Sequence, residues 1–244
     1  MTDLDLAAAG GTDAGLTGKG NYDVVHLSVD PLLAIVADGM GTGDGSAMAG
    51  KTAVETLLQH VRAAGDQVGP AEIRRALAAA HQEIGAFGQR IGALAGCTLT
   101  AIIESAHGFW IVQLGDSRIY RLRAGTLELL TVDHTMAWLG AVHGWYPFDS
   151  PQAAAARYHL LRYVGHPGAP DPDVMALHPR PGDVYLLCTD GISDQVDYHR
   201  IAGLLGAREE PATTVDGLIA AANAAGGIDN ETAIVITVAG RVRR

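Results

Sequence analysis

The spacing of apolar residues changes period along the first part of the chain, and this change constrains the fold. Residues 21–38 have the alternating and continuous apolar runs of two strands, with a hairpin at Asp30-Pro31. Apolar residues then recur at helical spacing over 43–61 and again over 70–91, where Pro70 suits a first helical turn. The sequence therefore predicts a strand pair followed by two helices, after a start of about twenty small and polar residues.

The period returns to two in the middle of the chain. Residues 97–133 contain four short strand patterns joined by tight turns, which predict a β-meander. Beyond an irregular stretch over 134–180, with a helix-like pattern at 151–165, we expect a strand, two helices and a last strand. This order differs from a doubly wound βαβ fold and predicts antiparallel sheets flanked by helices.

Composition narrows the class of protein. A chain of 244 residues, 48% of them hydrophobic, has material for one domain with a substantial core. The net charge of −10 argues against nucleic acid as a partner, and no apolar run is long enough to span a membrane. Two cysteines in apolar strand patterns fit a reducing compartment. We expect a single cytoplasmic domain over 1–244 that is a monomer.

Aspartates recur at the ends of the predicted strands. Asp38, Asp116 and Asp190 each follow an apolar run, and Asp229 precedes one. An isolated Asp-Gly pair is common turn chemistry. Four aspartates at comparable strand ends instead favour a site for a hard cation such as Mg²⁺ or Mn²⁺, which prefers oxygen ligands. Spacing alone does not decide between the two interpretations.

Four motifs that contain these aspartates, "VADGMG", "GDSR", "TDGISD" and "DNETAIVI", occur in an order that resembles a known family. The chain is similar over residues 12–238 to the metal-dependent Ser/Thr protein phosphatases (PPM, type 2C), in their short bacterial form. The resemblance implies an α+β fold, a four-layer α-β-β-α sandwich of two packed antiparallel sheets with helices on both outer faces. It also implies a variable flap, residues 134–180.

The resemblance implies roles for individual residues. Asp38 matches the carboxylate that bridges two metal ions, and Gly39 matches the residue that lends a backbone carbonyl to one of them. Asp190 and Asp229 match the other ligands of the first metal, and Asp116 matches a ligand of a third, weaker metal shared with Asp190. The implied cofactors are two or three Mg²⁺ or Mn²⁺ ions.

The implied reaction is hydrolysis of phosphoserine or phosphothreonine on a protein, through a water that bridges the metals. The catalytic residues implied are Asp38, Asp190 and Asp23, the last of which matches an aspartate that hydrogen-bonds this water. No covalent phosphoenzyme is required, so neither cysteine is expected to be a nucleophile.

Two positions depart from the family pattern. Gly18 stands where the family has an Arg that contacts phosphate, and only the adjacent Lys19 offers a positive charge. Tyr22 stands where the family has an acidic residue that reaches the second metal. Asp44 either compensates for that loss or caps the helix that begins near Ser46, and the cap is favoured.

These departures leave two alternatives open. In the first alternative the chain is a catalytically weakened member that acts as a regulatory binding module. In the second it is a phosphatase of small phosphate esters.

Other candidates receive structural interpretations. His134 is expected to be structural. The flap aromatics favour local packing, with an apolar contact to the substrate protein as the functional alternative; they are Trp138, Trp145, Tyr146 and Phe148.

Overall fold

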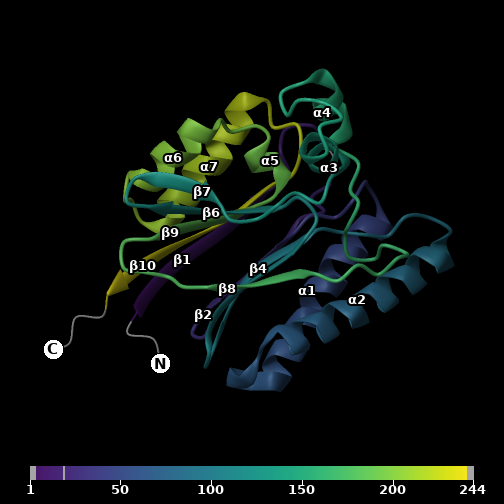
Figure 1. Ribbon diagram of the computed structural model, residues 1–244, viewed down its shortest axis with the longest axis horizontal. Coiled ribbons are helices and arrows are strands. Elements are labelled where there is room, and N and C mark those ends of the chain that lie inside the picture. Colours follow the sequence, from purple (N-terminus) through teal and green to yellow (C-terminus); the bar gives the residue numbers. More distant parts are fainter. Residues whose placement is uncertain (1–3, 19, 241–244) are drawn as a thin grey trace.

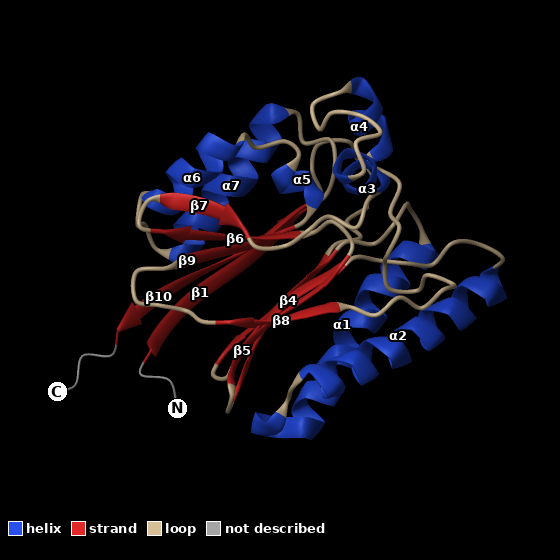
Figure 2. Ribbon diagram, viewed as in Figure 1, coloured by secondary structure: helices blue, strands red, loops and turns tan. Residues whose placement is uncertain are grey.

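The computed structural model describes residues 4–18 and 20–240 and has the four-layer architecture expected from the sequence. Two five-stranded antiparallel sheets pack face to face, in strand orders β1-β10-β9-β6-β7 (sheet A) and β2-β3-β4-β5-β8 (sheet B). Helices cover both outer faces (Figures 1 and 2). The predicted α-β-β-α sandwich is confirmed.

Sheet B lies on the first helical layer. Its strands are β2 (Val24–Val29), β3 (Leu32–Ala37), β4 (Leu99–Ser105), β5 (Gly108–Leu114) and β8 (Asp173–Leu177). The helices on its outer face are α1 (Asp44–Ala64) and α2 (Pro70–Ile91), with the short η1 (Gly65–Gln67) between them. All six residues of β3 are buried, since one face packs against α1 and α2 and the other against sheet A.

Sheet A lies on the second helical layer. Its strands are β1 (Leu4–Asp13), β6 (Arg118–Arg123), β7 (Thr126–Leu129), β9 (Val184–Cys188) and β10 (Glu231–Gly240). Its outer face carries α6 (Tyr198–Gly206) and α7 (Pro211–Ala225), and the short α5 (Asp190–Ser193) follows β9 directly. In the flap, α3 (Met136–Val142) and α4 (Pro151–Ala156) lie beside α5 at one end of the sandwich (Figure 1).

The predicted meander is wrong in one respect. Its four strands exist, but β4 and β5 belong to sheet B whereas β6 and β7 belong to sheet A. The chain changes sheets through Gly115, Asp116 and Ser117, so β5 and β6 do not pair. Local alternation is the same for two strands in one sheet and two strands in different sheets, so the pattern does not show the change.

Three further expectations differ from the structure. Strand β1, in the small and polar start, was not predicted; it pairs along its length with β10. The helix expected over 151–165 ends at Ala156, because Leu160 and Val164 pair as isolated bridges with other segments. Asp44 is the first residue of α1 and the cap position is Gly43, so the predicted capping role of Asp44 is wrong.

Among residues 4–18 and 20–240 there is no helix with the length and apolar character needed to cross a membrane.

Candidate metal centre

One pocket of about 280 Å³, the carboxylate pocket, brings the four strand-end aspartates together. Asp38 follows β3, Asp116 follows β5, Asp190 begins α5, and Asp229 lies just before β10. Gly39 also lines it. Because the antiparallel strands of both sheets place these ends at one edge of the sandwich, residues far apart in the sequence surround the same space.

The backbone at Asp38 is held by Thr98, which lies directly before β4. Asp38 N donates to Thr98 Oγ1 over 3.0 Å, and Thr98 N donates to Asp38 O over 2.9 Å. Thr98 Oγ1 also lies 2.7 Å from Ser117 Oγ, beside Asp116. One hydroxyl thus joins the two turns that carry Asp38 and Asp116.

Gly39 is required by close packing. A Cβ at this position would lie 2.7 Å from Ser46 O and 2.9 Å from Tyr22 O, closer than any side chain tolerates. The glycine therefore lets the turn after Asp38 pass between α1 and the segment before β2.

His134 anchors the turn that carries Asp116. Gly115 N donates to His134 Nδ1 over 3.1 Å, and His134 N donates to Gly115 O over 3.0 Å. The ring Nε2 lies 2.9 Å from Asp173 Oδ2. Burial lowers the pKa of His134, which fits a neutral ring with one acceptor and one donor nitrogen. The predicted structural role of His134 is confirmed.

Asp23 lies behind the pocket rather than in its lining. Its Oδ2 accepts a 2.8 Å hydrogen bond from Thr189 Oγ1, and Thr189 directly precedes Asp190. Thr232 N in turn donates to Thr189 Oγ1 over 3.2 Å. The hydroxyl of Thr189 therefore links Asp23 to the end of β9.

Burial and mutual repulsion raise the pKa of Asp38, Asp116, Asp190 and Asp23. Burial acts first on Asp38, and the neighbouring Asp23 and Asp190 add to it, so the pKa of Asp38 lies well above its usual value. Burial and Asp190 raise that of Asp116 in the same way. The pKa values of Asp23 and Asp190 rise to about 7, again chiefly through burial. Among the described residues, the charges that act on Asp38 and Asp116 are chiefly negative, and Arg157 lowers the pKa of Asp190 by less than burial raises it.

The donor chemistry of this cluster fits a hard divalent cation. Every candidate side-chain ligand offers carboxylate oxygen, the ligand that Mg²⁺ and Mn²⁺ prefer, and a cation would offset the repulsion described above. Over the described ranges, no three His, Cys, Asp or Glu side chains are already close enough to hold an ion.

Tyr22 lines the pocket where the family has an acidic residue. Its ring packs over Gly20, where a Cβ would lie 3.2 Å from the phenol oxygen. Asp44 is not among the lining residues, so the structure offers no support for Asp44 as the replacement ligand. Lys19, the candidate phosphate contact, lies outside the described residues.

Residues that the sequence reasoning missed complete the pocket. Asn230 Oδ1 accepts from Tyr22 N over 2.8 Å, and its Nδ2 donates to Ala14 O and Gly20 O, each over 3.1 Å. The signal was an amide directly after Asp229, inside a motif already singled out. Tyr158 of the flap also lines the pocket, although nothing in the local pattern pointed to it.

Both cysteines are unsuited to nucleophilic chemistry. Cys97 and Cys188 are fully buried and free. Burial raises the pKa of Cys97 far above its usual value and that of Cys188 to about 12, so neither thiol ionises near neutral pH.

Known proteins share the sequence and the fold. The family described as Protein phosphatase 2C matches residues 14–216. The Ser/Thr protein phosphatase PstP of Mycobacterium tuberculosis is 33% identical over 96% of this chain, which spans 45% of the length of that relative. The Ser/Thr phosphatase stp of Listeria welshimeri is 28% identical over 92% of this chain and 93% of its own.

A solved structure agrees with these relatives. The catalytic domain of PstP in complex with two manganese ions superimposes with a TM-score of 0.84 at 31% identity, over 97% of this chain and 99% of that one. With this agreement in motifs, sequence and fold, the chain belongs to the protein phosphatase 2C family.

Proposed function

We propose that this protein is a Mg²⁺- or Mn²⁺-dependent phosphatase that hydrolyses phosphoserine or phosphothreonine on protein substrates. The observation that carries the proposal is the convergence of Asp38, Asp116, Asp190 and Asp229 on one pocket, with Asp23 directly behind it. The PstP relative is named a Ser/Thr protein phosphatase, and its catalytic domain binds two manganese ions.

In this proposal Asp38, Asp190 and Asp229 hold the first metal, with Gly39 beside them, and Asp116 adds a ligand for a weaker one. Bound divalent cations bind phosphate oxygens and make water a better nucleophile at neutral pH. Asp190 is positioned at the start of α5 by the strand that precedes it. Asp23 accepts from Thr189, which holds its carboxylate close to Asp190, where it would hydrogen-bond the attacking water.

The experiment measures phosphate release from a phosphothreonine peptide with Mn²⁺, with Mg²⁺ and with chelator. We expect turnover with either metal and none with chelator, and Asp38→Asn should lose turnover with both metals. Full Mn²⁺-dependent activity in Asp38→Asn would overturn the assignment of the metal site.

The turnover assay, together with a calorimetric titration of Mn²⁺, separates the alternatives raised by Gly18 and Tyr22. Faster turnover of small phosphate esters than of phosphopeptides would favour a metabolite phosphatase. Calorimetry that detects no Mn²⁺ binding, together with no turnover, would favour a regulatory binding module.

A further inference from the structure

A second cavity, of about 550 Å³, lies next to the carboxylate pocket; we call it the side cavity. Its size falls within the roughly 300–1,000 Å³ that is typical of ligand sites. It lies between sheet A, the flap helices α3 and α4, and helix α6. Much of its lining is apolar, with Trp138 and Phe148 from the flap, Ala154 from α4 and Ile201 from α6.

The two cavities share their walls. Four residues of the carboxylate pocket each have a near neighbour that lines the side cavity. The pairs, with the residue of the carboxylate pocket first, are Asp116 and Arg118, Leu160 and Thr135, Tyr158 and Arg157, and Asp190 and Asp194. Leu160 and Thr135 pair through an isolated bridge, and Asp194 N donates to Asp190 O over 2.8 Å. The cavities therefore lie on two sides of one wall, and at the Thr135–Leu160 bridge the two backbones of that wall are roughly 4.5–5.5 Å apart.

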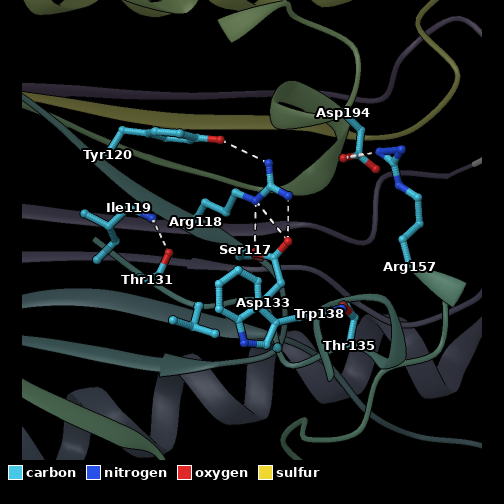
Figure 3. Close-up of polar contacts among 12 residues, drawn as sticks. Ser117, Arg118, Ile119, Tyr120, Thr131, Asp133, Thr135, Trp138, Arg157 and Asp194 are labelled. Atoms are coloured by element: carbon cyan, nitrogen blue, oxygen red, sulfur yellow. Dashed lines mark hydrogen bonds and ion pairs between the residues drawn. The ribbon is translucent and has the colours of Figure 1, made fainter. Parts of the chain in front are cut away.

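The arginines of the side cavity are already paired with carboxylates (Figure 3). Arg118 donates from Nη2 to Asp133 over 2.6 Å, and Arg157 forms an ion pair with Asp194 across the gap between α4 and α5. Arg118 uses Nε and Nη2 on Asp133 and Nη1 on Tyr120, and Asp194 offsets the charge of Arg157. Carboxylates therefore offset both positive charges of this cavity, which makes it a poorer anion site than one with unpaired arginines.

Two flap aromatics stand at the cavity with much of their surface exposed. The rings of Trp138 and Phe148 pack at 5.3 Å, yet the residues are 37% and 61% exposed. Tyr146 differs from them, because its hydroxyl donates to Met136 O over 2.6 Å and its ring packs over Gly140. Local packing thus accounts for Tyr146, whereas Trp138 and Phe148 leave an apolar surface open to a partner.

We propose that the side cavity binds an apolar side chain of the phosphoprotein substrate, preferentially an aromatic one, close in sequence to the phosphorylated residue. This inference rests on the function proposed above. A substrate with its phosphate in the carboxylate pocket must pass the shared wall, and an extended chain advances roughly 3.3 Å per residue. The bound side chain is then about two to four residues from the phosphorylated Ser or Thr, where Trp138 and Phe148 contact it edge-to-face or offset.

The test uses phosphothreonine peptides in which one position at a time, from four residues before to four after, is changed from Ala to Phe, Leu or Lys. We expect one position at which Phe raises kcat/KM about tenfold over Ala, the lower end of what burying one large apolar side chain contributes. Lys at that position should give no increase.

A matched pair of α4 variants then locates the effect. Ala154 and the neighbouring Ala155 are both exposed, but only Ala154 lines the side cavity. Ala154→Trp fills the cavity and should abolish the tenfold Phe-over-Ala preference, and Ala155→Trp should retain it. Phe148→Ala should reduce the preference without filling any space.

Two outcomes would count against the proposals, and they are distinguishable. Absence of Mn²⁺-dependent hydrolysis of every peptide and of para-nitrophenyl phosphate would overturn the phosphatase function itself. Hydrolysis without selectivity at any position, or a preference that survives in Ala154→Trp, would overturn only the side-cavity inference.

Discussion

Strand β9 carries an aspartate next to each of its ends, and the two have opposite electrostatic environments. Before the strand, Asp183 accepts from Arg123 Nε and Nη2, over 2.7 and 2.6 Å, and from the Tyr185 hydroxyl over 2.8 Å. Burial raises the pKa of Asp183, but these hydrogen bonds outweigh it and hold the pKa below its usual value. After the strand, burial and the neighbouring Asp194 raise the pKa of Asp190 to about 7.

The difference between Asp183 and Asp190 separates structural from functional carboxylates. Asp183 has a positively charged partner supplied by the chain itself, and it ties β9 to β6. Asp190 lies among other carboxylates, in an arrangement that a structural role does not require. Strongly perturbed groups of this kind in a pocket are characteristic of functional sites.

The largest expected difference between the two aspartates is in activity. Asp190→Asn should lower Mn²⁺-dependent kcat/KM for a phosphopeptide about 100-fold or more, since a metal ligand accounts for several kcal/mol of transition-state stabilisation. Asp183→Asn should stay within about threefold of the wild type when assayed well below its melting temperature. Equal losses in the two variants would remove the distinction drawn above.

The second difference is in folding stability. Asp183→Asn should lower the free energy of unfolding by about 2–3 kcal/mol at pH 7, because it leaves Arg123 without its charged partner. Urea denaturation measures this, with Asp216→Asn on the exposed face of α7 as the control.

The stability effect of Asp183 should also depend on pH. Its folded pKa lies below the ordinary value of 3.8, so its stabilisation is complete above that pH and is lost as the pH falls through the folded pKa. The gap between wild type and Asp183→Asn should therefore narrow below about pH 4. A gap that widens on acidification would contradict the pairing described here.

Metal binding should distinguish the two ends of β9 by thermal stability. Mn²⁺ at about 100 times its Kd should stabilise the wild type by about 2.7 kcal/mol. Asp183→Asn should be less stable without metal but should gain the same stabilisation from Mn²⁺. Asp190→Asn should lose most of the stabilisation by Mn²⁺. Thermal unfolding with and without Mn²⁺ measures both, and an undiminished increment in Asp190→Asn would exclude this residue as a ligand.

The smallest expected effect has the opposite sign. In chelator, Asp190→Asn should raise the free energy of unfolding by up to about 1 kcal/mol, because it removes one of several buried charges of like sign. Denaturation at pH 8 tests this against Asp183→Asn. A destabilisation similar to that of Asp183→Asn would show that Asp190 supports the fold.

Several elements could be predicted because their signals are local. The periodicity of α1 and α2, with Pro70 at the start of α2, follows from which residues face the core. The edge of sheet A could not be predicted in this way. Strand β1 is rich in Ala and Gly, and Gly11 lies under α7, where a Cβ would come within 2.9 Å of Val215 Cγ1. Close packing there removes the large side chains that reveal a strand.

By itself, the sequence determined which carboxylates lie at strand ends, because turn chemistry and ligand type are properties of short segments. Only the tertiary structure decided that the chain changes sheets at Asp116, that Asp23 lies behind the pocket on Thr189, and that a second cavity shares its walls. These features depend on how two sheets and a flap pack together, and packing joins residues that no local pattern relates.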